Sequence, residues 1–246
     1  MKSSTKTLVL YQPQNGYCYN SDTHFLFNFI KQNLKLYKNI KGELLDIGSG
    51  SGILGLLVAR DYENIKLNQA EIQKEFQFLS QKNADTNNIK NTLYKGSFLD
   101  LKFDKQFDYI VSNPPFYPSS VVQSINENLK IARYNDNLPL QQFISKASKL
   151  LKSKGQFFFC YDIKLLSDIV RFCSESKLNI ESLQFLHPKQ SKEATLVMVH
   201  TKKSSKSLVK ILPPAIMFDK EGEFMDSTND IYDLCSTHSI KYEVGI

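Results

Sequence analysis

The stretch that decides the fold is Leu44-Leu45-Asp46-Ile47-Gly48-Ser49-Gly50-Ser51-Gly52-Ile53-Leu54-Gly55. The apolar run at 43–47 predicts a buried parallel strand, and residues 53–60 predict a helix. Glycines between a strand and a helix permit a tight turn and let the backbone approach a ligand closely. The stretch therefore predicts a ligand-binding turn, with an ordinary strand–helix connection as the alternative.

The same alternation continues along the chain. Further strands are predicted at 65–70, 92–95, 107–112, 155–160, 180–186, 194–200 and 207–211, and further helices at 22–33, 72–84, 139–151 and 163–175. Strands that alternate with helices favour a doubly wound α/β sheet with right-handed crossovers. The last strands are joined by short links, which predicts an antiparallel pair with a hairpin turn at 202–206.

Composition limits the classes of protein. The 246 residues are 41% hydrophobic, which suffices for one buried core, and the net charge of +6 suits a polyanionic partner. The four cysteines form no C-x-x-C pair and only four histidines are present, so we expect reduced thiols, no disulfide framework and no metal site. No apolar run approaches the ~20 residues of a spanning helix, and no signal-peptide core is present. We therefore expect a cytoplasmic protein without a membrane partner.

The spacing of the glycines separates two kinds of ligand. A dinucleotide fingerprint needs G-x-G-x-x-G, but Ile53 stands where its third glycine belongs. The G-x-G-x-G spacing, with Asp46 two positions before Gly48, resembles motif I of class I S-adenosylmethionine-dependent methyltransferases. The resemblance implies S-adenosylmethionine as cofactor. The residues implied to hold it at this turn are Asp46, Gly48, Ser49, Gly50 and Gly52.

Two later strand ends complete the implied cofactor site. Glu71 ends the second strand of the unit, where an acidic side chain can accept both ribose hydroxyls, and Ile72 follows it. A solvated surface role is the alternative for a single glutamate. After the next strand, Ser97 stands where the family usually has the aspartate that binds adenine. Phe98 is expected either to pack on the adenine or to belong to the core.

A second turn, Asn113-Pro114-Pro115-Phe116, directly follows the predicted strand 107–112. Carboxyl ends of parallel strands meet at one edge of a sheet, so this turn and the glycine-rich turn should lie together. The Asn113 side-chain oxygen and the Pro114 carbonyl are suited to accept hydrogen bonds from an amine, and both prolines fix the backbone. Phe116 offers a face for stacking a planar group. A plain turn is the alternative reading of the same residues.

The order of these features resembles the bacterial family of tRNA adenine-N6 methyltransferases, which modify valine tRNA beside the anticodon. The supporting pieces are 14–22, 132–133, 139–155, 187–189 and 193–199. The likeness implies a Rossmann-like, seven-stranded, mostly parallel sheet with an antiparallel closing hairpin. It implies one domain over 1–246, with an N-terminal lid and helix segment at 1–35 and the core at 36–246. Tyr17 and Asp22 are implied cofactor or lid contacts, although Asp22 also suits a helix N-cap. Ser97 and Phe116 depart from the family pattern.

The acceptor stays open at this point. Guanine N2 of ribosomal RNA and a protein glutamine are the closest alternatives to adenine N6 in tRNA, and a nonenzymatic RNA-binding module is a remote one. Lysines late in the chain would hold RNA phosphates if they flank the carboxyl edge of the sheet; otherwise they form a solvated face. These lysines are Lys189, Lys192, Lys202, Lys203, Lys206 and Lys210.

Overall fold

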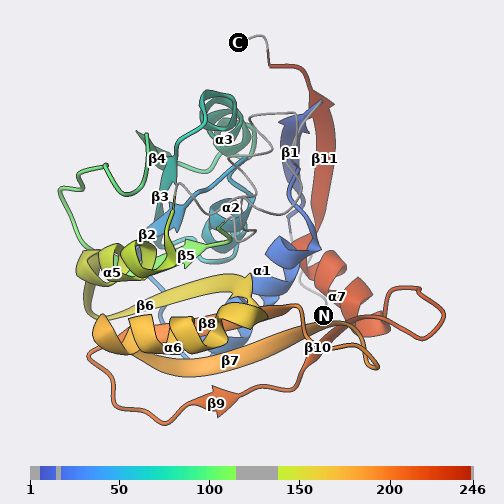
Figure 1. The fold of residues 1–246 in the computed structure, drawn as a ribbon. Helices are drawn as coiled ribbons and strands as arrows, with labels where there is room; N and C mark the ends of the chain where they lie inside the picture. The colour runs from blue at the N-terminus through green and yellow to red at the C-terminus, as the bar shows by residue number, and fades with distance from the viewer. Residues whose placement is uncertain (1–5, 15–17, 115–137, 245–246) are drawn as a thin grey trace.

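The computed structural model describes residues 6–14, 18–114 and 138–244 (Figure 1). In these residues a nine-stranded sheet has the order β10-β7-β8-β6-β5-β2-β3-β4, with β9 paired to β7. The strands are β2 (Gly42–Ile47), β3 (Ile65–Glu71), β4 (Asn91–Lys95), β5 (Phe107–Ser112), β6 (Leu151–Asp162), β7 (Leu178–Lys189), β8 (Leu196–Lys203), β9 (Lys210–Ile211) and β10 (Ala215–Phe218).

The centre of the sheet has the predicted doubly wound arrangement. Strands β4, β3, β2, β5 and β6 are parallel, and β8 runs antiparallel to both β6 and β7. These seven strands confirm the α/β, mostly parallel sheet with an antiparallel closing pair. Strands β9 and β10 extend it by pairing with β7 in parallel.

The hairpin turn predicted at 202–206 is wrong. Strand β8 continues through Lys203, and β6 and β7 already pair with its two edges. The next strand therefore has no free edge of β8 to join, and β9 pairs with the outer edge of β7 instead.

Helices cover both faces of the sheet. The helices between β2 and β4 lead to strands on one side of β2. The helices between β5 and β7 lead to strands on the other side of β2. Right-handed crossovers therefore place these two sets of helices on opposite faces of the sheet. In Figure 1, α5 and α6 lie in front of the sheet and α1 lies behind it. The helices are α1 (Ser21–Leu34), α2 (Ile53–Asp61), α3 (Lys74–Thr86), α5 (Leu140–Leu150), the 3₁₀ turn η2 (Ile163–Leu165), α6 (Leu166–Glu175) and α7 (Asp226–Cys235).

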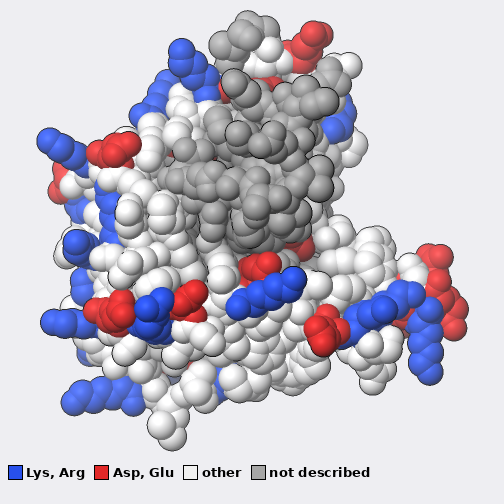
Figure 2. Space-filling model, in the orientation of Figure 1, with Lys and Arg blue, Asp and Glu red and all other residues white. Residues whose placement is uncertain are grey.

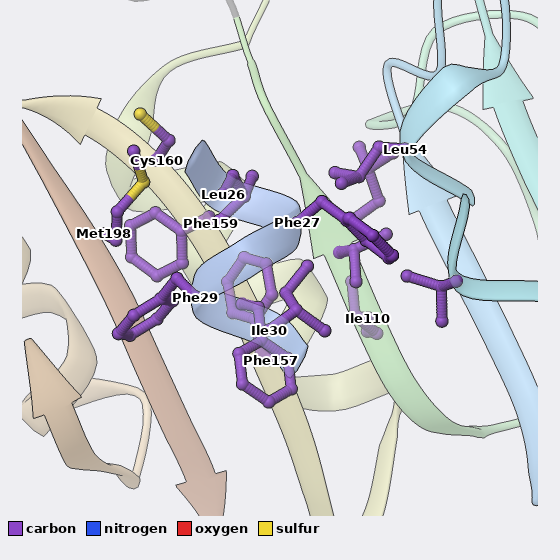
Figure 3. Close-up of a cluster of buried hydrophobic side chains, with 14 of the residues drawn as sticks. Leu26, Phe27, Phe29, Ile30, Leu54, Ile110, Phe157, Phe159, Cys160 and Met198 are labelled. Atoms are coloured by element: carbon purple, nitrogen blue, oxygen red, sulfur yellow. The ribbon is translucent and has the colours of Figure 1, made fainter. Parts of the chain in front are cut away.

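Helix α1 lies inside the core rather than on the surface. Phe27, Phe29 and Ile30 are fully buried, and they pack between β6 and the region of α2 (Figure 3). Burial of one such side chain stabilises the fold by about 1.5–3 kcal/mol. This packing fixes the position of α1, and with it the residues of its first turn.

The two ends of the described chain form a separate two-stranded sheet. Strand β1 (Leu8–Pro13) pairs in parallel with β11 (Thr237–Tyr242). Asn83 of α3 binds the backbone N–H and carbonyl of Tyr11 at 2.6 and 3.0 Å. Gln12 donates to the hydroxyl of Ser51 at 2.7 Å, so β1 is held against the glycine-rich turn.

No helix within the described ranges is long and apolar enough to cross a membrane. The sulfurs of Cys18, Cys160, Cys173 and Cys235 are free thiols. Burial raises the pKa of Cys173 and Cys235 to about 12. Among the same residues, no group of three or more His, Cys, Asp or Glu side chains is arranged to hold a metal ion.

Candidate functional site

The glycine-rich turn and Asn113 lie at the same edge of the sheet. Strands β2 and β5 are neighbours, with Asp46 opposite Val111. The Ser112 hydroxyl donates to the carbonyl of Ile47 at 2.8 Å, which joins the last residues of the two strands. One pocket results. Its lining residues are Tyr19, Thr23, Asp46, Gly48, Ser49, Gly50, Ser51, Ile53, Leu54, Phe76 and Asn113.

The turn needs glycine for two separate reasons. Gly52 has φ +91°, and an added Cβ would lie 2.7 Å from Nε2 of Gln69. Gly55 lies in α2, where a Cβ would come within 2.9 Å of Oδ2 of Asp46. Because Gly55 has no side chain, its backbone N–H reaches the same Asp46 oxygen at 2.9 Å. The glycines thus bring the start of α2 against the carboxylate that lines the pocket.

Asp46 is the buried charge of the pocket. Burial raises the pKa of Asp46 to about 7, the nearby Glu71 charge adds to the rise, and hydrogen bonds from Gly55 and Gln69 oppose it. A cationic ligand in the pocket would favour the ionised carboxylate. Asp46 therefore has the chemistry needed to bind a sulfonium or ammonium group.

Glu71 joins the glycine-rich turn to the end of β3. Its Oε2 accepts the N–H of Gly50 at 2.8 Å, and its Oε1 accepts the N–H of Gln73 at 2.8 Å. Burial raises the pKa of Glu71, and these backbone hydrogen bonds oppose the rise. Each carboxylate oxygen keeps a further lone pair for a hydroxyl donor. Ile72 beside it is 41% exposed, which leaves an apolar surface next to this carboxylate.

The turn after β4 shows whether Phe98 lies at the pocket or in the core. The Phe98 ring is 6% exposed and packs against Phe103 and Phe143, with ring centroids 6.1 and 6.3 Å apart. Phe98 is thus a core side chain, and the structure does not bring it to the pocket. Ser97 is half-buried, and its carbonyl accepts the N–H groups of Asp100 and Leu101.

Asn113 lines the pocket and carries a buried hydrogen-bond acceptor without a partner in the described part of the chain. Its Nδ2 donates to the Thr23 hydroxyl at 3.0 Å, whereas its Oδ1 is buried and has no partner among the described residues. A buried acceptor without a partner costs about 1–3 kcal/mol, so this oxygen is suited to a ligand donor. Pro114 follows and is buried. Pro115 and Phe116 lie outside the described residues.

The start of α1 contributes contacts that the sequence did not indicate. Tyr19 and Thr23 line the pocket; Tyr19 lies just before the N-cap residue of α1, and Thr23 lies in its first turn. The predicted N-cap role of Asp22 is wrong, because Asn20 is the N-cap residue and has extended backbone angles. Asp22 lies inside the first turn and accepts from Asn20 at 2.6 Å; burial raises its pKa. Tyr17 lies outside the described residues.

The late lysines separate into two groups. Strand β8 runs opposite to β6, so Lys202 pairs with Gln156, far from the carboxyl end of β6. Lys203 donates to the carbonyls of Ser148 and Leu151 at 2.7 and 2.9 Å. Both lysines, and the segment 204–209 after them, therefore miss the expected edge, since the direction of β8 was not fixed by the sequence.

Lys189 and Lys192 do lie at the carboxyl edge, at the end of β7 and in the link to β8. Lys189 donates to the carbonyl of Lys220 at 3.1 Å, and Lys192 is exposed. In the view of Figure 2, acidic and basic side chains are interspersed and form no continuous basic patch among the described residues.

The residues of the pocket fit S-adenosylmethionine. A Cβ added at Gly48 or Gly50 would meet nothing within 4 Å, so open space adjoins the turn. The Ser49 hydroxyl lines the pocket, is buried and has no partner in the described part of the chain. With Asp46 and Glu71, these groups offer acceptors for a cation and for ribose hydroxyls beside a turn that admits close approach.

Known proteins that this chain resembles in sequence or in fold include methyltransferases. A tRNA1(Val) (adenine(37)-N6)-methyltransferase from Pedobacter heparinus is 26% identical over 63% of this chain and 67% of its own length. A release factor glutamine methyltransferase from Flavobacterium psychrophilum is 30% identical over 62% of this chain and 57% of its own length. A predicted O-methyltransferase from Agrobacterium tumefaciens shares the fold, with a TM-score of 0.65 at 16% identity over 89% of this chain and 99% of that one.

A family model covers most of the site residues described above. Residues 21–168 match the model described as the methyltransferase small domain. The matched range contains the glycine-rich turn, Glu71, Thr23 and Asn113, and it spans more than half of the chain. The chain belongs to the methyltransferase small domain family.

Proposed function

We propose that this protein transfers a methyl group from S-adenosylmethionine to an exocyclic amine, namely N6 of an adenine in tRNA. One observation carries the proposal. The buried Oδ1 of Asn113 has no partner in the described residues, and Asn113 lines the same pocket as Asp46 and the glycine-rich turn. A hydrogen-bond acceptor for an N–H group and an acidic partner for a cationic methyl donor are thereby adjacent.

The residues supply positioning and polarity. The nitrogen of an aromatic amine is a poor nucleophile because its lone pair is delocalised into the ring. The Asn113 oxygen would accept one N–H bond and the Pro114 carbonyl the other, which stabilises the positive charge that develops on nitrogen. The cofactor, when bound, supplies an electrophilic methyl group that needs no further activation. The amine proton then becomes acidic and can leave to water, so no strong base is needed.

The similarity to the tRNA methyltransferase from Pedobacter supports adenine N6 as the acceptor. The net charge of +6 also suits a polyanion. An unstacked base of an anticodon loop enters a small pocket at low cost, which fits a chain that recognises RNA with its loops. Such a protein would act in the cytoplasm. We further propose that 1–246 form one domain, in which 1–35 cover the cofactor and 36–246 form the core.

A second acceptor is favoured by one comparison. The release factor glutamine methyltransferase has the higher identity of the two relatives, and a glutamine amide also carries a planar NH2 group that Asn113 could bind. Guanine N2 of ribosomal RNA presents the same group. All three acceptors use the same oxygen of Asn113, so the site alone supports the reaction type more strongly than the acceptor.

Mass spectrometry of a deletion strain would distinguish these acceptors. We expect total tRNA to lose one N6-methyladenosine, with ribosomal RNA and release factors unchanged. Unchanged tRNA together with a lost methyl group on ribosomal guanine or on a release factor would replace adenine N6 by that acceptor. Complementation with the wild-type gene should restore the lost modification.

A further inference from the structure

The first turn of α1 holds the side chain of Asn113. Thr23 is 3% exposed and accepts a hydrogen bond from Nδ2 of Asn113 at 3.0 Å. We propose that Thr23 is a positioning residue, which orients the Asn113 amide so that its oxygen faces the substrate amine. This inference rests on the proposed function, because it assigns a role within the same reaction.

The amide must be oriented for the reaction. An asparagine amide can turn by 180° about its Cβ–Cγ bond, which exchanges an acceptor for a donor at nearly the same place. Only one orientation offers oxygen to an N–H group; the other would direct an NH2 group toward the NH2 of the substrate. The Thr23 hydroxyl oxygen accepts the amide N–H, and Oδ1 keeps no partner among the described residues.

Both partners of this hydrogen bond are anchored. The ring of Tyr232 on α7 packs against His24, the neighbour of Thr23, with ring centroids 4.7 Å apart. The Phe27 side chain one turn further along is fully buried. On the other side, the Ser112 hydroxyl binds the carbonyl of Ile47 and so fixes the backbone that leads to Asn113. The acceptor is therefore preorganised, which lowers the cost of organising it during the reaction.

Kinetic measurements can show whether Thr23 orients Asn113 or only stabilises the fold. Thr23→Val keeps the shape of the side chain and removes the hydroxyl. We expect kcat to fall about 10- to 100-fold, the loss associated with a small misplacement of a reacting group, while the Kd for S-adenosylmethionine stays within about twofold. Thr23→Ser keeps the hydroxyl and should retain kcat within about threefold. A Thr23→Val enzyme with wild-type kcat would overturn the proposal.

Thr228 provides the matched control. It is a fully buried threonine in the first turn of α7, and its hydroxyl donates to the carbonyls of Met217 and Ile216 at 2.9 and 3.2 Å. Thr228→Val removes a buried hydroxyl of the same kind away from the pocket. We expect it to lower Tm and leave kcat unchanged. An equal fall of kcat in both variants would show that loss of stability, rather than orientation of Asn113, explains the Thr23 result.

A measurement without substrate separates this inference from the proposed function. In protein labelled with ¹⁵N-asparagine, the side-chain NH2 signals of Asn113 are assigned by their loss in Asn113→Ala. We expect slow hydrogen exchange of these protons in the wild-type protein and faster exchange in Thr23→Val. If the wild-type protein methylates no tRNA but shows this difference, the proposed acceptor fails and the positioning role stands. Equal exchange in both proteins would contradict the positioning role whatever the acceptor.

Discussion

Gly50 donates its backbone N–H to the carboxylate of Glu71 at 2.8 Å. The glycine-rich turn after β2 and the acidic end of β3 are thereby joined by a direct hydrogen bond, and Gln73 binds the other carboxylate oxygen. The residue that is placed to bind ribose hydroxyls also fixes the shape of the turn. A change at Glu71 should therefore affect the cofactor site in two ways.

Glu71→Gln should weaken the binding of S-adenosylmethionine by at least about tenfold. The substitution replaces one acceptor oxygen by an NH2 group that faces a backbone N–H, and a hydrogen bond to a charged group contributes about 1.5–3 kcal/mol. Isothermal titration calorimetry would measure the Kd. Glu43→Gln is the control, because Glu43 lies in the neighbouring β2 and pairs with Lys105 outside the pocket. Equal affinities for wild-type and Glu71→Gln proteins would refute the role of Glu71.

Asp46→Asn should change how stability depends on pH. Burial raises the pKa of Asp46 from 3.8 to about 7, so the folded state binds this proton more tightly than the unfolded chain does. The stabilising contribution of the neutral carboxyl is complete below about pH 4 and is lost as the pH rises through about 7. Thermal unfolding should show the Asp46→Asn protein gaining stability relative to the wild-type protein across this range.

A difference in Tm between the Asp46→Asn and wild-type proteins that is the same at about pH 4 and about pH 8 would contradict this prediction. Because the charges of Asp46 and Glu71 interact, this difference in Tm reports the coupled titration of the two carboxyl groups.

Gly52→Ala should destabilise the protein more than a glycine replacement that imposes backbone strain alone. At φ +91° an alanine costs about 1–3 kcal/mol, and its Cβ would also clash with Gln69 at 2.7 Å. Gly222 is a matched control, since it has φ +100° but the nearest atom to an added Cβ is Nζ of Lys189 at 3.7 Å. Urea unfolding should show that Gly52→Ala lowers the free energy of unfolding more than Gly222→Ala does. Equal losses would show that the contact with Gln69 contributes nothing.

Lys192→Glu should weaken tRNA binding, whereas Lys206→Glu should not. Both lysines are exposed, and both substitutions change the net charge equally, but only Lys192 lies at the carboxyl edge of the sheet. The slope of log Kd against log salt should fall by about 1 for Lys192→Glu, as expected when one phosphate contact is lost. Filter binding at several salt concentrations measures it, and identical slopes for the two variants would exclude Lys192 as a contact.

Local sequence signals predict most of the central sheet. The strand, glycine-rich turn and helix at 43–60 lie next to one another in the chain, so periodicity and turn residues suffice to identify them. Strands β1 and β11 carry no such signal, because each pairs with a segment at the opposite end of the described chain. The same reason explains Thr23, whose role depends on contact with Asn113.

The predictions that proved wrong concern the direction of strand β8 and the exact start of helix α1. The sequence allows Lys202 and Lys203 to flank a phosphate-binding edge, but the antiparallel direction of β8 places them at the other edge. Asp22 suits a helix cap by its residue type, although Asn20 takes that place two residues earlier. Such shifts of one or two residues are common at helix ends, where several polar residues compete for the cap.

The most direct test of the account is methyl transfer by Asn113→Ala measured together with cofactor binding. Tritium transfer to unmodified tRNA should fall by about 100-fold or more, because the acceptor oxygen for the amine is removed. Calorimetry should give a Kd for S-adenosylmethionine within about twofold of the wild-type value, because the glycine-rich turn and Glu71 remain intact. Turnover close to that of the wild-type protein, with normal cofactor binding, would contradict the assignment of Asn113 as the residue that binds the substrate amine.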